Sequence, residues 1–256
     1  MSKVKILFMG RKPVAGKSLE WLASRDDVEV VGVITDSHLP SSICKRIAEK
    51  HKIPLFSFTD ALEQTNSGEL KFDLGLSMLF WRKLKEGLVH SPELKTINFH
   101  PAPLPEYKGT AGYNLAILEG LDEWAMTAHY VDDEIDTGEI IEVQSFPICN
   151  ATETAQSLES TSQEQLYTLF VSVVEKVLQN KCILPTSPNI GGRYISRAEM
   201  ESMKEIKDGD DIPRKIRAFW FPPYDGAYVT IGSTKFTLVD ECILASLASS
   251  SVSKVF

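Results

Sequence analysis

Residues 96–141 hold an amide, an imidazole and a carboxylate side chain in positions that favour chemistry. Asn98 and His100 lie two residues apart at the end of a short apolar run, so on an extended strand both side chains leave the same face. The proline-rich residues 101–105 then force the chain out of the sheet, which leaves the pair where open α/β sheets place ligands. Asp136 follows a second apolar run and precedes a turn signal. If they converge, these three residues are suited to acid–base chemistry on a carbonyl.

The segments around these residues predict the sheet that must position them. Continuous apolar runs such as residues 3–9 are typical of parallel strands covered on both faces. Strands that alternate with helical spacing predict an α/β fold with a doubly wound, mostly parallel Rossmann-like sheet. The expected strands are residues 3–9, 28–35, 53–57, 73–78 and 126–131, and the expected helices are residues 15–25, 41–51 and 154–179.

The C-terminal part predicts a small subdomain of different character. Residues 211–219 predict a short helix with Pro213 in its first turn. Two alternating segments, residues 228–231 and 235–243, are joined by Gly232-Ser233 and predict a β-hairpin. We expect the serine-rich tail from Ser246 to fray. The expected domains are a catalytic core over residues 1–200 and a C-terminal helix and hairpin subdomain over residues 201–256.

Composition excludes several classes of protein. The net charge of −8 and a pI near 5.2 argue against a broad basic surface for nucleic acid. The four cysteines are isolated, so neither a metal site nor a disulfide framework is indicated. No window approaches the roughly 18 apolar residues of a membrane span, and the N-terminus has no signal-peptide pattern. We therefore expect a cytoplasmic protein with no membrane partner.

The turn after the first strand partly resembles the sequence of a phosphate-binding loop. Five residues separate Gly10 from Gly16, where the P-loop has four, and no GxGxxG fingerprint is present. A cationic turn with Arg11 and Lys12 beside a helix N-terminus remains a candidate site for a substrate phosphate. The alternative is a solvated turn whose charges bind nothing.

Four motifs resemble a known family of enzymes. NFHP at residues 98–101, LPEYKG at 104–109, HYV at 129–131 and DTG at 136–138 resemble the formyltransferases that use N10-formyltetrahydrofolate. That family includes glycinamide ribonucleotide, methionyl-tRNA and sugar N-formyltransferases. HPAPLPEYKG and the later IRAFWFPPYDGA look most like the members that act on nucleotide-linked amino sugars.

The resemblance implies roles for the three polar residues. Asn98 would donate a hydrogen bond to the formyl oxygen, and His100 would act as general base to the attacking amine. Asp136 would orient His100, fix its protonation or hold a bridging water. Each residue alone would more often serve structure, but together with the family pattern they favour catalysis. His129 lies inside a strand pattern and is expected to be structural or to support these residues.

The resemblance also implies binding residues for two substrates and no metal. The folate co-substrate would meet Phe80, Trp81, Arg82, Leu84 and Ile135, largely through main-chain groups, although Trp81 and Leu84 could instead pack in the core. For the nucleotide-linked substrate, Arg11 or Arg82 would meet the diphosphate, and an aromatic wall would stack on the base. The candidate substrate residues are Arg11, Lys12, Tyr107, Trp220 and Tyr224.

The sequence thus predicts a formyltransferase that acts on the amine of a nucleotide-linked amino sugar. The expected acceptor is a 4-amino-4,6-dideoxyhexose on dTDP, which would place the enzyme in O-antigen or lipopolysaccharide biosynthesis. A homodimer follows if the hairpin pairs with its copy. The alternatives are another amine acceptor of the methionyl-tRNA or glycinamide ribonucleotide type, a formyltetrahydrofolate hydrolase, and a non-catalytic folate- or nucleotide-binding module.

Overall fold

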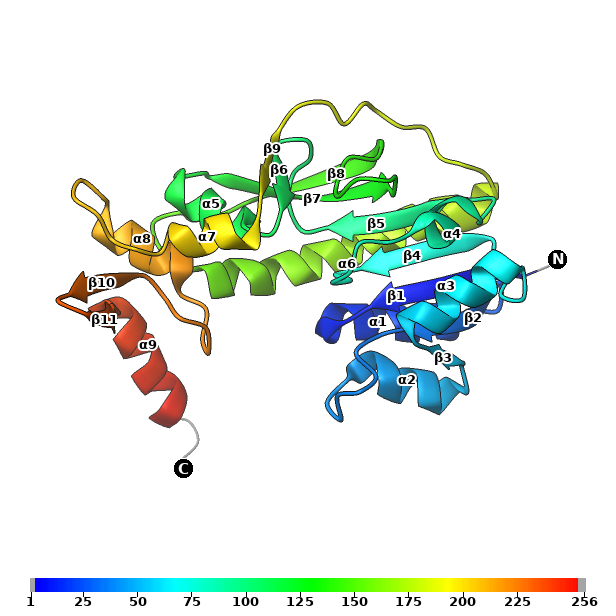
Figure 1. The fold of residues 1–256 in the computed structure, drawn as a ribbon, viewed down its shortest axis with the longest axis horizontal. Coiled ribbons are helices and arrows are strands. Elements are labelled where there is room, and N and C mark those ends of the chain that lie inside the picture. The colour runs from blue at the N-terminus through cyan, green and yellow to red at the C-terminus, as the bar shows by residue number, and fades with distance from the viewer. Residues whose placement is uncertain (1–2, 253–256) are drawn as a thin grey trace. The chain divides into compact units, whose positions relative to one another are not determined.

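The centre of the fold is a seven-stranded sheet, seen in a computed structural model that describes residues 3–252 (Figure 1). Its strands are β1 (Val4–Gly10), β2 (Val28–Ile34), β3 (Leu55–Phe56), β4 (Leu74–Met78), β5 (Thr96–His100), β7 (Glu123–Tyr130) and β8 (Ile140–Pro147). Their order is β3-β2-β1-β4-β5-β7-β8. β1 to β5 pair in parallel, and β7 runs antiparallel to β5. The predicted α/β fold with a mostly parallel Rossmann-like sheet is confirmed.

Helices connect these strands more often than the sequence patterns indicated. The predicted helices correspond to α1 (Lys12–Ala23), α2 (Ile43–His51), α6 (Ala155–Asn180) and α8 (Ile212–Phe219). Four helices within residues 3–252 were not predicted, and one of them, α3, follows Ser57, whose side chain accepts a hydrogen bond from Asp60 N as an N-cap. These four are α3 (Phe58–Ser67), α4 (Glu86–His90), α5 (Gly112–Leu118) and α9 (Glu241–Val252). The charged residues 193–207 predict a partly helical segment, and α7 (Arg197–Ser202) lies within it.

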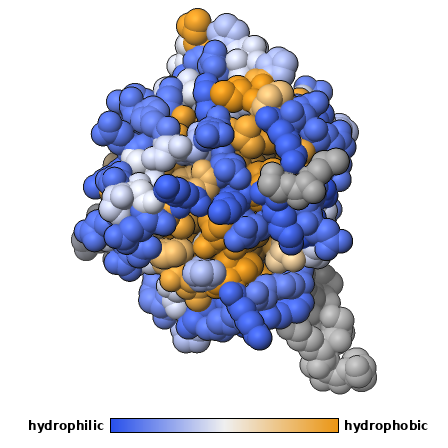
Figure 2. Space-filling model, turned by 90° about the vertical axis from the view of Figure 1, so that its right-hand side faces the viewer, coloured by the Kyte–Doolittle hydropathy of each residue, from blue (hydrophilic) through white to orange (hydrophobic). Residues whose placement is uncertain are grey.

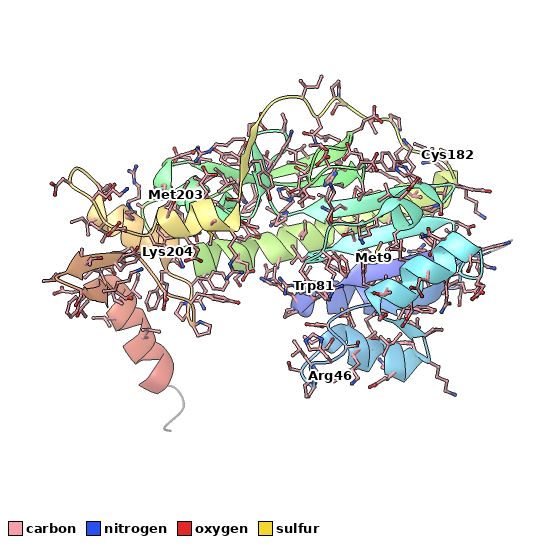
Figure 3. All side chains as sticks on the ribbon, in the orientation of Figure 1. Met9, Arg46, Trp81, Cys182, Met203 and Lys204 are labelled. Atoms are coloured by element: carbon pink, nitrogen blue, oxygen red, sulfur yellow. The ribbon has the colours of Figure 1, made fainter. Side chains whose placement is uncertain are left out.

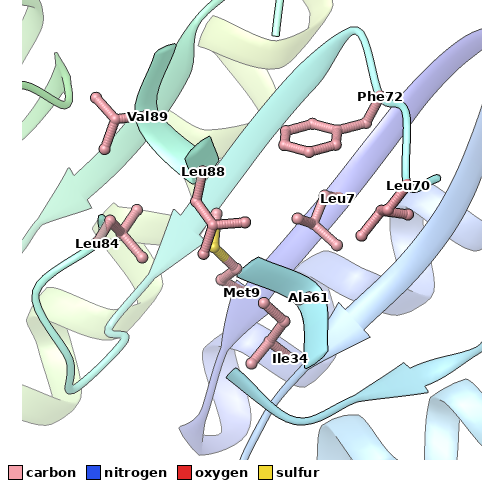
Figure 4. Packing of buried hydrophobic residues seen from close by; sticks show 9 residues of the cluster. All are labelled: Leu7, Met9, Ile34, Ala61, Leu70, Phe72, Leu84, Leu88 and Val89. Atoms are coloured by element: carbon pink, nitrogen blue, oxygen red, sulfur yellow. The ribbon is translucent and has the colours of Figure 1, made fainter. Parts of the chain in front are cut away.

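Both faces of the central strands β1, β4 and β5 are largely buried, which is why these strands are continuous apolar runs in the sequence. On one face, the residues of a hydrophobic cluster pack from strands β1 and β2 against α3 and α4 (Figure 4). On the other face, Phe170 of α6 lies edge-on to Phe8 and 4.9 Å from the ring of Phe99. The cluster consists of Leu7, Met9, Ile34, Ala61, Leu70, Phe72, Leu84, Leu88 and Val89. Apolar residues along residues 154–179 recur at helical spacing and predict one buried face for this helix, and the structure confirms it. The buried residues are Leu158, Leu166, Leu169, Val173, Val174 and Val177.

The chain divides into two compact units, each made of several segments. The first comprises Met1–Lys108, Ala125–Ser145 and Ser162–Arg193, and it holds most of the sheet. The second comprises Gly109–Trp124, Phe146–Thr161 and Tyr194–Phe256. The division at residue 200 stays a prediction.

The second unit contains the predicted helix and hairpin. Asp211 caps α8 by accepting from Arg214 N, and Asn114 of α5 donates to the carbonyl of Ala218. The antiparallel strands β10 (Tyr228–Ile231) and β11 (Thr234–Thr237) are joined through Gly232, whose φ of 62° suits a tight turn. The short strands β6 (Tyr107–Gly109) and β9 (Arg193–Ile195) complete the described strands.

Two predictions for the C-terminus were wrong. The second hairpin strand does not extend to residue 243, because β11 ends at Thr237 and Asp240 accepts from Ile243 N at the start of α9. The tail from Ser246 is not frayed over its described part, since α9 runs to Val252. The apolar residues between Cys242 and Leu247 favour this helix over a loop. Residues 253–256 lie outside the described part of the chain.

The surface mixes polar and apolar residues. Figure 2 shows one face on which hydrophilic residues surround a group of hydrophobic ones. Scattered exposed apolar side chains are ordinary on folded proteins, so this mixture alone indicates no site. Within residues 3–252, no helix has both the length and the apolar character needed to cross a bilayer.

Candidate active site

Three neighbouring strands bring the central polar residues into one row. Asn98 of β5 lies opposite Ser77 of β4 on one side and His129 of β7 on the other. His100 follows at the carboxyl end of β5, as the proline-rich sequence after it predicts. Strand pairing therefore assembles the row from residues that are 21 and 31 positions apart along the chain.

Asp136 joins this row from the loop after β7. Its Oδ1 lies 3.5 Å from Nδ1 of His100 and 3.7 Å from Nε2 of His129. The structure thus brings together the three residues that the sequence singled out, and their catalytic roles stay predictions.

The loop that carries Asp136 is held in one shape by its backbone contacts. Asp136 has a positive φ of 56°, and a Cβ on Gly138 would lie 1.8 Å from the carbonyl oxygen of Tyr130, so only glycine fits there. Asn189 donates from Nδ2 to the carbonyls of Asp136 at 3.0 Å and Gly138 at 2.8 Å. Thr137 donates to Asp132 at 2.6 Å. These contacts aim the Asp136 carboxylate at the two imidazoles.

The contacts of His100 define which ring nitrogen is available. Its Nε2 lies 2.8 Å from the carbonyl oxygen of Tyr107. A carbonyl only accepts, so Nε2 carries the proton and Nδ1 presents its lone pair toward Asp136. Burial lowers the pKa of His100, and it prevails over the opposing effects of Asp136 and the Tyr107 carbonyl, which raise that pKa. The site therefore holds a neutral imidazole whose proton-accepting nitrogen has a carboxylate beside it.

The amide of Asn98 is held on both sides. Oγ of Ser77 lies 2.8 Å from Oδ1 of Asn98, and Nε2 of His129 lies 3.1 Å from its Nδ2. Nδ1 of His129 in turn lies 2.7 Å from the carbonyl oxygen of Tyr130. Ser77 and His129 are buried, whereas Asn98 is only partly so. An amide held in this way can present a fixed donor to a ligand.

The predicted folate residues divide into exposed and buried side chains. Trp81 is 38% exposed and lies beside the carboxyl end of β1 (Figure 3), and Ile135 is also exposed. Phe80 is tilted against Trp81 with ring centroids 4.7 Å apart. Leu84 is buried within the hydrophobic cluster, so its side chain serves packing, as the alternative interpretation held. Arg82 lies over the ring of Phe58 at 5.4 Å from its centroid.

The predicted substrate residues lie in both units. In the first, Arg11 stands at the N-cap of α1 with its guanidinium 5.4 Å from the ring centroid of Trp81. Lys12 has a positive φ of 73°. Tyr107 contributes its carbonyl to His100. In the second unit, Trp220 ends α8, and Tyr224 is 62% exposed.

The start of α1 was predicted too late in the chain. The helix begins at Lys12, three residues before the expected position, with Pro13 in its first turn. Two further site residues, Ser77 and Asn189, were missed. Ser77 is a polar residue inside a fully buried strand, which was an available signal. Asn189 lies in a loop and gave no periodic signal.

Other places in the described part of the chain offer less for this chemistry. No group of three or more His, Cys, Asp or Glu side chains within residues 3–252 is arranged to hold a metal ion. A cavity of about 440 Å³ lies in the second unit and is lined by Lys207, Asp210, Arg214 and Lys215 among others. Lys215 already donates to Asp210 at 2.6 Å.

Curated relatives of similar sequence are methionyl-tRNA formyltransferases. The protein from Staphylococcus epidermidis is 34% identical over 155 residues, which are 56% of this chain and 49% of the relative. The protein from Azobacteroides pseudotrichonymphae is 30% identical over 256 residues, which are 91% of this chain and 76% of the relative. The match to the Staphylococcus epidermidis protein thus spans about half of that relative's length.

Solved structures of similar fold include N-formyltransferases. A 4-N formyltransferase from Francisella tularensis has a TM-score of 0.78 at 23% identity, over 93% of this chain and 97% of that one. An N-formyltransferase from Helicobacter canadensis, in complex with folinic acid and dTDP-3-aminofucose, has a TM-score of 0.71 at 28% identity, over 93% and 89% of the two chains.

The family model of the formyl transferases covers the part of the chain that holds the site. It matches residues 3–174, which include the row on β4, β5 and β7 and the loop of Asp136. The match covers well over half of the 256 residues. Together with the geometry of Asn98, His100 and Asp136, it shows that this chain belongs to the formyl transferase family.

Proposed function

We propose that this protein transfers the formyl group of N10-formyltetrahydrofolate to the amine of a nucleotide-linked amino sugar. The observation that carries the proposal is the 3.5 Å approach of Asp136 Oδ1 to the unprotonated Nδ1 of a buried, neutral His100. Folinic acid, a formylated folate, and a dTDP-amino sugar are the ligands in the complex of the Helicobacter canadensis enzyme, which supports both substrates.

Each of the three residues has a distinct role in the transfer. The folate co-substrate supplies an electrophilic formyl carbon. Nδ2 of Asn98 donates to the formyl oxygen, which becomes negative when the amine attacks, and one such donor is worth about 10²–10³ in rate. Nδ1 of His100 takes the proton that the amine loses on forming the new C–N bond. The carboxylate of Asp136 stabilises the resulting imidazolium, which returns the proton to the nitrogen that leaves.

Exposed groups from several loops would contact the two larger ligands. The partly exposed ring of Trp81 and the side chain of Ile135 offer apolar surface to the pterin, and main-chain groups of their loops offer hydrogen bonds. Arg11 would meet the diphosphate as a charge-assisted donor. Trp220 and Tyr224 would stack on the base. The proposed acceptor is a 4-amino-4,6-dideoxyhexose on dTDP.

Methionyl-tRNA is the second candidate acceptor, because the curated relatives are named methionyl-tRNA formyltransferases. The net charge of −8 over the 256 residues speaks against it, since tRNA binding depends on neutralising many phosphates. A nucleotide sugar carries two phosphates, which one or two basic residues can meet.

Release of tetrahydrofolate in the presence of each candidate acceptor tests the proposal. The purified protein and N10-formyltetrahydrofolate are mixed with dTDP-4-amino and dTDP-3-amino sugars, UDP-amino sugars, methionyl-tRNA, glycinamide ribonucleotide or buffer alone. We expect release that depends on a dTDP-amino sugar, with the N-formyl product detected by mass spectrometry. Asn98→Ala is the matched control and should abolish most of this release.

Three results contradict the proposal in different ways. Release with methionyl-tRNA alone would assign the second candidate. Release in buffer alone at the same rate would assign hydrolysis. Binding of folate without release under any condition would assign a binding module.

The proposal includes a cytoplasmic homodimer formed through the C-terminal hairpin. Ile231 and Phe236 are apolar residues on opposite strands of the hairpin. Their exposed fractions are 66% and 48%. Light scattering should give twice the chain mass for the natural protein and the single chain mass for Ile231→Asp with Phe236→Asp. An unchanged mass in this variant would contradict the interface.

A further inference from the structure

We propose that His129 is a positioning residue that selects one orientation of the Asn98 amide, so that the nitrogen of this amide, rather than its oxygen, faces the substrate. The inference rests on the proposed function, in which Asn98 donates to the formyl oxygen. It gives a role to a buried histidine that has no part in the proton transfer.

The first step is the tautomer of His129. Its Nδ1 lies 2.7 Å from the carbonyl oxygen of Tyr130, and that oxygen only accepts hydrogen bonds. Nδ1 therefore carries the proton in the neutral ring. Nε2 is left with a lone pair, and this lone pair points at the Asn98 amide 3.1 Å away.

The second step is the choice between the two orientations of the amide. With Nδ2 toward His129, an N–H of Asn98 meets the lone pair of Nε2 and forms a hydrogen bond. With the amide turned over, Oδ1 would face that lone pair, and two acceptors would stand at hydrogen-bonding distance with no hydrogen between them. Only the first orientation is compatible with the neutral ring.

Ser77 completes the hold on the amide without selecting its orientation. Its Oγ lies 2.8 Å from Oδ1 of Asn98 and donates to it. A hydroxyl group both donates and accepts, so Ser77 would also satisfy the inverted amide. The selection therefore comes from the lone pair of His129 Nε2.

The third step counts the hydrogens of the amide. Nδ2 of Asn98 carries two, and one is engaged by His129. The second remains for the ligand, and Asn98 is less buried than Ser77 and His129 on either side of it. Because the row is fixed by the pairing of three strands, this donor is in place before the substrate arrives, which is what stabilises a developing oxyanion most effectively.

Two substitutions at His129 separate positioning from packing. His129→Leu keeps an apolar side chain of similar length but removes the acceptor. His129→Gln can place an oxygen acceptor near the position of Nε2. We expect kcat to fall about 10²–10³-fold in the leucine variant, the size of a lost oxyanion donor, with KM for the folate unchanged. The glutamine variant should recover at least a tenth of the natural kcat.

A double-mutant cycle with Asn98→Ala shows whether His129 acts through Asn98. If it does, adding His129→Leu to Asn98→Ala lowers kcat by less than about threefold, because the donor is already absent. An equally large loss in both backgrounds would overturn the inference, and so would a leucine variant with the natural kcat.

Nitrogen NMR of the ligand-free protein tests the geometry independently of any activity. Long-range ¹H–¹⁵N spectra should show His129 protonated at Nδ1 and bare at Nε2, and one Asn98 side-chain amide proton should shift upfield in His129→Leu. A His129 ring protonated at Nε2 would overturn the inference, whether or not the protein transfers formyl. If His129 shows the expected tautomer but the protein transfers formyl to none of the acceptors, only the proposed function is contradicted.

Discussion

The carboxyl ends of β1 and β5 both present polar side chains, but the protein holds them differently. At the end of β5, His100 is 5% exposed and donates to the Tyr107 carbonyl, and the Asn98 amide is fixed from two sides. At the end of β1, Arg11 is exposed, caps no backbone group with its side chain, and rests over the ring of Trp81. Hydrogen bonds hold the side chains at the end of β5, whereas a ring contact holds Arg11 at the end of β1.

This difference matches what the two ends are proposed to do. A donor and a base that act on a carbonyl must be held in place before the reaction, since reorganising them costs rate. A diphosphate needs only nearby positive charge on a side chain that can follow it. The following predictions test this difference in order of decreasing expected effect.

His100→Gln should have the largest effect. Glutamine can still donate to the Tyr107 carbonyl but offers no base at the position of Nδ1. We expect kcat to fall about 10²–10⁴-fold, the usual contribution of a general base. His90→Gln, at an exposed histidine, is the control and should keep the natural rate. A His100→Gln variant with natural kcat would remove the base from the mechanism.

Asp136→Asn should have a smaller effect on rate and a diagnostic effect on pH dependence. The Asp136 charge raises the pKa of His100 against the effect of burial, so its removal lowers that pKa further. Because the neutral imidazole is the active form, the acidic limb of kcat/KM should move to lower pH, while kcat falls about 10²-fold through the unstabilised imidazolium. Movement of that limb to higher pH would contradict the assigned contact.

Arg11→Ala should weaken binding while leaving chemistry intact. Losing one charge-assisted hydrogen bond costs about 1.5–3 kcal/mol, which raises KM for the nucleotide sugar about 10–100-fold. Added salt should reduce the difference in KM between the variant and the natural protein, because the contact is exposed and salt screens it. A loss of kcat as large as in His100→Gln would mean that the two strand ends do not differ as described.

The stability of the protein should depend on pH through His100, with the smallest effect of the series. Its pKa is lowered in the folded state, so the unfolded chain takes up this proton first as pH falls. The contribution is fully present above about pH 6.5 and is lost as pH drops toward the folded pKa, by about 1.4 kcal/mol for each unit between the two values. Urea unfolding from pH 8 to pH 5 should show that the free energy of unfolding declines less steeply in His100→Gln than in the natural protein.

Local patterns were reliable where a segment's environment is uniform along its length. The run in β1 is buried on both faces, and α6 buries one stripe over seven turns, so both were predicted with nearly correct bounds. The prediction that the second hairpin strand continues beyond Thr237 was wrong, because the alternation of apolar and polar residues continues into the cap of α9. There Asp240 accepts a hydrogen bond from Ile243 N and the backbone changes from strand to helix. The side chain of Leu84 packs in the hydrophobic cluster, because a large apolar side chain near a site is still more stable in the core, and a main-chain contact of Leu84 with the folate stays a prediction.

Short-range signals in the sequence identified the parallel strands, the helices α1, α2, α6 and α8, and Asn98, His100 and Asp136 as candidate site residues, since strand period, proline stops and turn signals act over a few residues. The residues that surround Asn98, His100 and Asp136 were set only by tertiary contacts. Ser77, His129 and Asn189 reach them from 21 to 53 positions away, through strand pairing and a loop contact. The proton position on His100 follows from the carbonyl of Tyr107, which the fold places against its Nε2, whereas the proton position on His129 follows from the carbonyl of its chain neighbour Tyr130.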